Sequence, residues 1–350
     1  MNLHVDYKQK KEERNSAIEA LRFLTIFQIC LWHMSYPVTA AGFLGVEFFF
    51  ILSGFFMYRT AIMPDSPGVL AYSFRKLKKF WFKIVLALLL TYAVFYQGII
   101  TEFQENWLMP ILRFISEILL MQSIGSFEHG LNNPIWFFST LIYGGAFVYG
   151  LAKYYTKLSI RIFFPIMAVL YFAYTFKNGT HETLENWDVV GCMPLSLVRG
   201  ICEMGLGVLV GYSYYNYGDK LKCHIGILNI ITIVALVLYL AIIAKNRQFS
   251  QYALIFIPVI ICGTLTPNTV FSNLLCGSFW RFLGRISFDI FIIHYPLIAL
   301  FRHFLLVEAR LPLCIVAILY YMALVPCACA FDKVSIKINN YLFCPNMGAK

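Results

Sequence analysis

Long apolar segments recur along the whole of this 350-residue chain, and they constrain its fold more than any other feature. A helix needs about 20 predominantly apolar residues to cross the hydrocarbon core of a bilayer. We therefore predict an all-α, polytopic membrane helix bundle with about ten full spans. The predicted spans are residues 17–36, 42–59, 80–100, 135–152, 160–176, 194–216, 224–244, 252–270, 279–301 and 311–331.

Composition excludes the main soluble classes. Hydrophobic residues make up 60% of the chain and charged residues 13%, against roughly 45–50% and about 25% in an average soluble domain. A soluble globular enzyme, a disordered chain and a coiled coil are therefore excluded. The net charge of +10 could indicate a nucleic-acid partner in a soluble protein, but cations in cytoplasmic loops explain it better here. We expect membrane lipids, and no nucleic acid, among the partners.

A further segment, 107–124, is apolar but contains a proline and two charged residues. If it crossed the membrane fully, the basic loop around Lys153 and Lys157 would lie outside, against the positive-inside rule. We therefore expect it to be a partial or re-entrant segment. No sizeable soluble appendage is apparent, so we predict a single transmembrane domain over residues 1–350.

The distribution of cations orients the bundle. The basic N-terminal tail, 1–16, and the basic loop, 59–79, should both be cytoplasmic, and the count of spans then places the C-terminal tail, 332–350, on the same side. The pair Lys245 and Arg247 is the one basic cluster that this arrangement fits badly. The polar start runs directly into the first span, and we expect no cleavable signal peptide.

The ten cysteines give no sign of a metal site. Most lie inside apolar segments, and no Cys-x-x-Cys pair is present. Cys327 and Cys329 are too close together to build a four-ligand site. We interpret the cysteines as small buried hydrophobic residues and expect no metal.

Ionisable residues inside predicted spans are functional candidates because they are expensive to bury in a membrane. Glu19 and Arg22 lie one helical turn apart near the cytoplasmic end of the first span and can pair. The pair is either an interfacial ion pair or an anchor for a charged substrate or a neighbouring helix. Arg199 and Glu203, four residues apart, can pair along one helix face, as a structural salt bridge or as part of a site.

His33 and Glu47 fall at one predicted depth. Their spans are joined by a short loop, and at about 1.5 Å per residue both lie roughly 6–8 Å below it. A carboxylate that fixes the tautomer of a histidine is the arrangement a general base needs, provided that the two side chains face each other. A histidine in a membrane helix can equally be a packing residue. His294 is either a third group at this depth or a helix-end residue held against the backbone by Pro296.

Cations also gather at the predicted cytoplasmic ends of the third and ninth spans. They either follow the positive-inside rule and meet anionic lipid headgroups, or they form a phosphate-binding mouth for a nucleotide-like donor. No Walker motif or dinucleotide fingerprint is present, which disfavours ATP-driven transport. The cations are Arg75, Lys76, Lys78, Lys79, Arg281 and Arg285.

Four sequence blocks follow one another along the chain. They are Ile18-Glu19-Ala20-Leu21-Arg22 with His33 eleven residues after the arginine, Gly45-Val46-Glu47-Phe48-Phe49-Phe50 with Ser53-Gly54, Asn133-Pro134-Ile135-Trp136-Phe137-Phe138-Ser139, and Leu283-Gly284-Arg285-Ile286-Ser287 leading to Ile293-His294-Tyr295-Pro296. In this order they resemble the acyltransferase 3 family of integral membrane O-acyltransferases, which modify bacterial surface glycans.

The resemblance implies a location in the bacterial plasma (inner) membrane, acetyl-CoA or another acyl-CoA as cytoplasmic donor, and a glycan hydroxyl as acceptor. Arg22 and His33 match the family's Arg-x10-His element, which is associated with activity. The family's Arg-x-x-Arg element, proposed to meet CoA phosphates, is matched by Arg75 and Lys78, and a lysine lacks the bidentate fork of arginine. The chain also departs from the family with Glu19-Ala20 where Asp-Gly is common.

These readings combine into one expected mechanism. Arg75, Lys78 and Arg285 would hold the CoA phosphates, and His33, oriented by Glu47, would take the proton of the acceptor hydroxyl. The developing oxyanion needs a donor. The candidates for that and other supporting roles are Trp136, Ser139, Arg199 and His294.

Two rival functions explain part of the sequence. A glycan or lipid transporter or flippase would account equally well for the apolar bulk and the buried charges. It does not account for the cytoplasmic basic cluster combined with a histidine near the opposite face. A catalytically inactive structural subunit of an envelope complex is the other alternative.

Overall fold

The protein is represented by a computed structural model, in which the structure describes residues 15–34, 40–124, 130–178, 189–190, 193–245 and 247–343. The predicted all-α class is confirmed. The described residues contain one small antiparallel sheet, in which β1 (Val189–Val190) pairs with β2 (Met193–Pro194). The longer helices are α1 (Ser16–His33), α2 (Gly45–Ala61), α3 (Val69–Val94), α4 (Tyr96–Glu105), α5 (Leu108–Ile118), α6 (Trp136–Tyr154), α8 (Phe164–Asn178), α9 (Leu195–Cys223), α10 (Ile225–Lys245), α11 (Ala253–Leu265), α13 (Ser278–Phe301) and α14 (Leu313–Phe343).

Short helical elements complete or join these helices. They are η1 (Gly42–Leu44), η2 (Gln122–Ile124), η3 (Asn133–Ile135), α7 (Thr156–Leu158), η4 (Ser159–Phe163), η6 (Arg247–Tyr252), α12 (Val270–Leu274) and η7 (Arg302–Glu308).

Each predicted span coincides with a helix, although the predicted number is approximate. The described residues contain eight helices that are long and apolar enough to cross a membrane, or nine if α3 and α4, bent by 79°, form one broken span. One predicted span, 17–36, corresponds to α1, which is not among these eight or nine helices. The 18 residues of α1 include Glu19, Arg22 and His33. The predicted partial segment, 107–124, contains α5, whose 11 residues extend over about 16 Å. That is about half the thickness of a bilayer core.

Two helices extend beyond the predicted spans. We placed the cations around Arg75 in a loop that ends at residue 79, but α3 begins at Val69 and carries them on helical turns. We also began a C-terminal tail at residue 332, whereas α14 continues to Phe343. Both helices extend past the apolar segment because polar residues on exposed faces do not interrupt helical hydrogen bonding.

The cysteine prediction holds in part. Cys30 and Cys202 are buried, as expected, but Cys223, Cys276 and Cys314 are exposed on the surface of the molecule. Apolar surroundings in the sequence do not separate a buried face from one that faces lipid.

Helices α2 and α9 cross with their backbones in contact. A Cβ atom at Gly54 would lie 1.9 Å from the Met204 carbonyl oxygen, and one at Gly207 would lie 2.0 Å from the Ile51 carbonyl oxygen. Small residues permit this close approach of helices in membrane proteins. The crossing turns one face of α2, including Glu47, toward α9.

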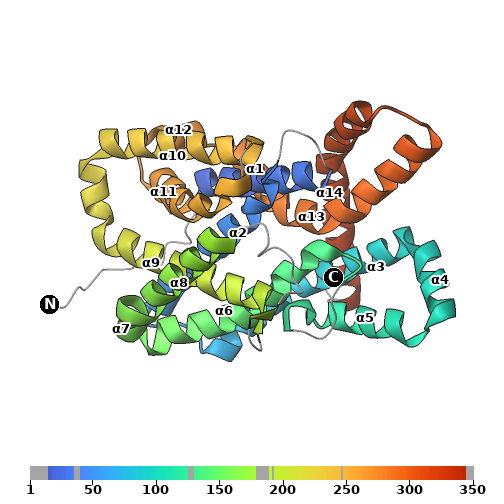
Figure 1. Ribbon diagram of the computed structural model, residues 1–350, viewed down its shortest axis with the longest axis horizontal. Helices are drawn as coiled ribbons and strands as arrows, with labels where there is room; N and C mark the ends of the chain where they lie inside the picture. Colours follow the sequence, from blue (N-terminus) through green and yellow to red (C-terminus); the bar gives the residue numbers. More distant parts are fainter. Residues whose placement is uncertain are drawn as a thin grey trace, which may run out of the picture.

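A second close crossing joins α1 to α13, which lie side by side in Figure 1. A Cβ atom at Gly284 would lie 2.3 Å from the Cβ atom of Glu19. The crossing brings the first and fourth sequence blocks together, and Arg22 and Arg285 line the same cavity. The crossing forms one side of this cavity, which α3, α6 and α14 help to enclose.

Candidate functional site

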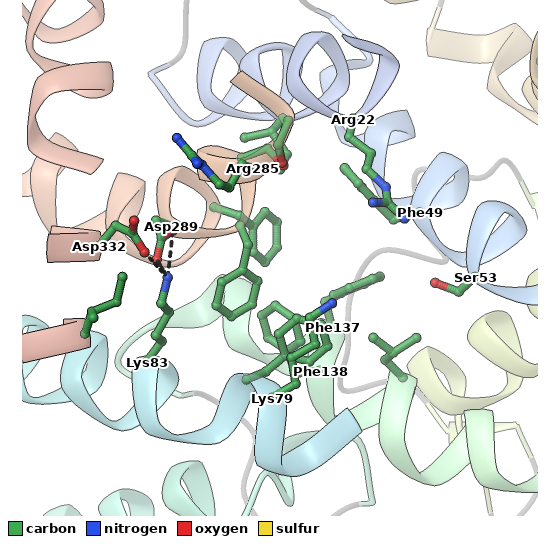
Figure 2. Close-up of a pocket in the computed structure, with 18 residues that line it drawn as sticks. Arg22, Phe49, Ser53, Lys79, Lys83, Phe137, Phe138, Arg285, Asp289 and Asp332 are labelled. Carbon is green, nitrogen blue, oxygen red and sulfur yellow. Dashed lines mark hydrogen bonds and ion pairs between the residues drawn. The ribbon is translucent and has the colours of Figure 1, made fainter. Parts of the chain in front are cut away.

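A cavity of about 550 Å³ lies among α1, α2, α3, α6, α13 and α14. Four cationic side chains line it, from three different helices: Arg22 of α1, Lys79 and Lys83 of α3, and Arg285 of α13. Lys79 and Lys83 share a face of α3 because they are four residues apart. Figure 2 shows Arg22 and Lys79 approaching the cavity from opposite sides. The site has the charge to hold an anionic group.

Phenylalanine rings form much of the remaining wall. They come from helices that are distant in sequence, and neighbouring rings touch, with 5.6 Å between the ring centroids of Phe138 and Phe291. A cationic part beside an aromatic wall suits a ligand that has an anionic end and a less polar remainder. The rings are Phe49, Phe80, Phe137, Phe138, Phe288 and Phe291.

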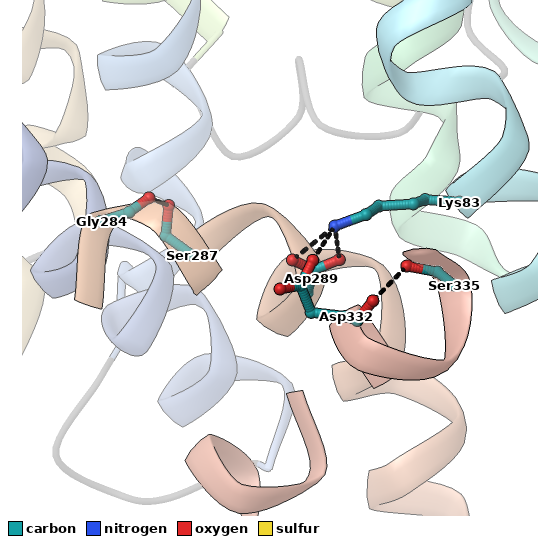
Figure 3. A network of polar contacts seen from close by, with 6 residues as sticks. All are labelled: Lys83, Gly284, Ser287, Asp289, Asp332 and Ser335. Carbon is teal, nitrogen blue, oxygen red and sulfur yellow. Dashed lines mark hydrogen bonds and ion pairs between the residues drawn. The ribbon is translucent and has the colours of Figure 1, made fainter. Parts of the chain in front are cut away.

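Lys83 connects three helices through two carboxylates (Figure 3). Its Nζ donates to Asp289 Oδ1 at 2.7 Å and to Asp332 Oδ1 at 2.6 Å. The Ser335 hydroxyl donates to the Asp332 carbonyl oxygen at 2.8 Å, which adds a local turn contact in α14. Sequence reasoning missed all three charged residues. The intramembrane-charge rule could have found Lys83 and Asp289, because both lie inside predicted spans.

The predicted Glu19–Arg22 pair is confirmed. Arg22 Nη1 lies 2.8 Å from Glu19 Oε1, and the Arg22 guanidinium lies 5.8 Å from the ring centroid of Phe56. Glu19 is buried against Gly284, whereas Arg22 is partly exposed and lines the cavity. The pair therefore fixes the side chain of a cavity-lining cation.

Two histidines lie directly behind the aromatic wall. The ring centroids of His33 and His294 are 5.1 Å apart, and the His294 ring is 5.6 Å from that of the cavity-lining Phe291. His294 is fully buried, and its Nδ1 lies 2.5 Å from the Phe291 carbonyl oxygen. Because a carbonyl accepts and never donates, Nδ1 carries the proton. The lone pair then sits on Nε2, which has no hydrogen-bond partner among the described residues.

The expected orientation of His33 by Glu47 is wrong. In the structure Glu47 Oε1 lies 2.8 Å from Arg199 Nη2, and both side chains are buried. The predicted pair of Arg199 with Glu203 is confirmed, with 3.2 Å between Arg199 Nε and Glu203 Oε1. Equal depth of two residues leaves open the direction in which each side chain points. The α2–α9 crossing directs Glu47 to Arg199.

The remaining predicted residues mostly lie away from the cavity wall. Trp136 packs against Arg199, with 5.7 Å from the guanidinium carbon to the ring centroid. Ser139 is buried, and its Oγ accepts the backbone N–H of Ser123 at 3.0 Å, so it holds η2 against α6. Two residues of the same block, Phe137 and Phe138, do line the cavity.

Of the three residues predicted to contact phosphate, one lines the cavity and two do not. Arg285 lines the cavity, while Arg75 and Lys78 are exposed on α3 outside its lining. Lys78 and Lys79 differ by about 100° around the helix axis, so adjacent lysines have different surroundings. Within the described ranges, no group of three or more His, Cys, Asp and Glu side chains could hold a metal ion.

Comparisons with known proteins show which sequences this chain is similar to. A family model described as an acyltransferase domain matches residues 15–332. A Staphylococcus aureus (strain MSSA476) protein named Putative O-acetyltransferase is 22% identical over 346 residues, covering 87% of this chain and 54% of that relative. The peptidoglycan O-acetyltransferase OatA of Listeria monocytogenes serovar 1/2a (strain ATCC BAA-679 / EGD-e) is 20% identical over 312 residues, covering 81% and 49%. The chain thus spans about half the length of these relatives. No solved structure matches it.

Proposed function

Because the chain belongs to the acyltransferase family whose model matches residues 15–332, we propose that it is a membrane O-acyltransferase. It moves an acyl group, acetyl in the first instance, from acyl-CoA to a hydroxyl of a cell-surface or lipid-linked glycan. The names of its relatives support O-acetylation. The carrying observation is the cavity that joins four cations to an aromatic wall with two histidines behind it.

The cations support an acyl-CoA donor. CoA carries phosphates at one end and its thioester at the far end of a long arm. Arg22, Lys79 and Arg285 can contact phosphate oxygens through charge-assisted hydrogen bonds. Lys83 is held between Asp289 and Asp332, and Arg22 is paired with Glu19, so part of the cationic charge is already neutralised. The arm would then lie along the phenylalanine wall toward Phe291 and His294.

His33 is the proposed general base. It is partly exposed, whereas His294 is fully buried. We assign His294 to the role first expected of Glu47, because its ring is close to that of His33 and its Nε2 lone pair has no other partner among the described residues. In this role His294 would orient the His33 ring and stabilise its protonated form.

The proposed transfer conserves atoms and charge. A ring nitrogen of His33 takes the proton of the acceptor hydroxyl while the oxygen forms a bond to the thioester carbonyl carbon. The carbon–sulfur bond of the resulting oxyanion then breaks. The leaving thiolate of CoA takes the proton from the His33 imidazolium, which restores the neutral base.

The test compares two histidine variants of the purified protein. We expect His33→Ala to lower acetyl transfer from acetyl-CoA at least about 100-fold, since a general base contributes about that much or more. His224→Ala is the control, because His224 is exposed at the junction of α9 and α10. Thermal stabilisation by CoA should be the same in both variants. Full transfer activity in His33→Ala, or glycan movement that needs no acyl-CoA, would count against the proposal.

A further inference from the structure

A larger cavity, of about 1140 Å³, lies between the α3–α4 bend and the junction of α13 with η7. In Figure 1 these two parts project from the same edge of the bundle, with the α4–α5 arm facing the hairpin that runs from α13 to α14. The cavity around Arg22 and Arg285 shares no lining residue with it. The steps proposed above use none of its residues.

The two cavities lie at different levels of the same helices. On α13, residues up to Phe291 line the first cavity and residues from Ala299 line the second. His294 lies between them, about 4.5 Å along the axis from Phe291 and about 7.5 Å from Ala299. On α3, Lys83 lines the first cavity and Ala93 the second. A general base at the level of His294, such as the neighbouring His33, therefore lies between the two cavities.

Direct ring contacts connect the second cavity to His33. Phe95 lines the cavity, and its ring stacks on Tyr295 with 6.2 Å between centroids. Tyr295 in turn meets the His33 ring edge-on at 6.0 Å. One aromatic side chain thus separates His33 from the cavity wall.

The lining of the second cavity differs chemically from that of the first. No lysine or arginine lines it within the described ranges, and the His303 that does line it has its Nε2 atom 3.1 Å from Glu308 Oε1. It offers an amide at Gln97, a hydroxyl at Thr101 and a carboxylate at Glu105, next to the rings of Tyr96 and Phe304. Aromatic faces combined with a few hydrogen-bonding groups fit a sugar, whose rings have apolar faces and hydroxyl edges. The Gln97 amide donates to the Tyr96 hydroxyl at 3.1 Å, and the Thr101 hydroxyl donates to the Gln97 carbonyl oxygen at 3.2 Å. A lipid tail would still place hydrocarbon against the Glu105 carboxylate, which is unfavourable for a charged group.

The charge of the cavity restricts the sugar further. Glu102 and Glu105 both line it. Arg113 does not line the cavity, but it donates two hydrogen bonds to Glu102 and neutralises that carboxylate. The Glu105 carboxylate would repel an anionic group of a ligand. The same negative charge keeps CoA phosphates out of this space and leaves them to the cationic cavity.

We propose that this second cavity binds the acceptor as an uncharged sugar chain and presents its hydroxyl toward His33. The proposal rests on the acyltransferase function proposed above. It adds the class of acceptor and the place where the acceptor binds, and it separates donor and acceptor sites by the level of the two histidines.

Two glutamines of α4 allow a matched kinetic test. Gln97 lines the cavity, whereas Gln104 is exposed on the same helix outside the lining. With acetyl-CoA and a β-1,4-linked N-acetylglucosamine tetramer, Gln97→Leu should raise the KM for the tetramer about 3- to 10-fold, as expected for one lost hydrogen bond. The KM for acetyl-CoA should stay unchanged, and Gln104→Leu should change neither. An unchanged tetramer KM in Gln97→Leu would overturn the acceptor site while leaving the acyltransferase function in place.

A labelling experiment tests the site without catalysis. We expect a water-soluble maleimide to modify Gln97→Cys and Gln104→Cys, with the modified residue identified by mass spectrometry. The tetramer should slow labelling of Gln97→Cys at least about 3-fold and leave Gln104→Cys unaffected. A galacturonic acid tetramer should slow neither.

Three labelling results contradict the proposal. Labelling of Gln104→Cys without labelling of Gln97→Cys would mean that lipid fills the cavity. No protection by the uncharged tetramer, or protection by the anionic one instead, would overturn the assigned class of sugar. If the wild-type protein transfers no acetyl group but the tetramer protects Gln97→Cys, the acyltransferase proposal fails and the sugar site stands.

Discussion

The cations predicted or found near the donor site fall into two groups according to what they face. Arg22, Lys79 and Arg285 line the cavity, whereas Arg75 and Lys78 are exposed elsewhere on α3. Neighbours in sequence belong to different groups because a helix turns by about 100° per residue. We therefore expect the phosphate contacts of the donor to depend on cavity position more than on membership of a basic cluster.

Arg285 provides the corresponding test at the residue scale. Arg281, one helical turn earlier on α13, is also exposed and does not line the cavity. We expect Arg285→Ala to raise the KM for acetyl-CoA roughly 10- to 100-fold, as for the loss of a hydrogen bond to a charged group. Arg281→Ala should change it little. Equal effects of the two variants would show that the cations act only through the general field of the surface.

Glu47 is the residue whose role changes most between sequence and structure. It lies in a buried ion pair with Arg199, and removing one partner of such a pair costs about 3–5 kcal/mol. We expect Glu47→Gln to lower the melting temperature of the purified protein. Acetyl transfer per folded molecule should stay within about threefold of the wild type. Glu105→Gln, an exposed control, should leave the melting temperature unchanged. A loss of transfer at unchanged melting temperature would restore Glu47 to the catalytic group.

At the scale of helices, the α2–α9 crossing determines which buried groups meet. Gly207 and Gly218 both lie in α9, but a Cβ atom at Gly207 would be 2.0 Å from a backbone oxygen of α2, while nothing lies within 4 Å of one at Gly218. Gly207→Ala should therefore destabilise the protein by about 1–3 kcal/mol through overpacking. Gly218→Ala should stabilise it slightly, because alanine favours helix more than glycine does. Thermal unfolding of both variants measures the difference, and similar values would show that α2 and α9 separate without cost.

At the scale of the whole molecule, the arrangement of helices implies an orientation that the membrane can test. We expect the junction of α6 and α7, where Tyr155 is exposed, to be cytoplasmic, because α5 is too short to cross a bilayer. In intact cells, an impermeant maleimide should fail to label Tyr155→Cys, while a permeant one should label it. The wild-type chain, with its own exposed cysteines, gives the background. Labelling from outside would mean that the polypeptide crosses the membrane once more before α6 than we propose.

The first cavity is also a property of the whole molecule, because several helices build it. Its cations come from α1, α3 and α13, and its rings come from α2, α3, α6 and α13. The lining residues come from two parts of the chain, between Arg22 and Leu141 and between Gly284 and Ile336. Both ends of the stretch matched by the acyltransferase family, residues 15–332, are therefore needed to build it.

The sequence by itself determined the class of fold, because the hydrophobic segments had to be helices long enough for a bilayer. It also identified the pairs whose members lie one turn apart, Glu19 with Arg22 and Arg199 with Glu203, since helical spacing alone places them together. It singled out His33 and His294, but as separate candidates.

Tertiary structure decided every contact between helices. Glu47 meets Arg199, His33 meets His294, and Lys83 meets Asp289. A residue's depth follows from counting along a helix, but its direction depends on how that helix is rotated against its neighbours. That rotation is set by close crossings at small residues such as Gly54 and Gly284, and it is a property of the packed molecule that no single segment contains.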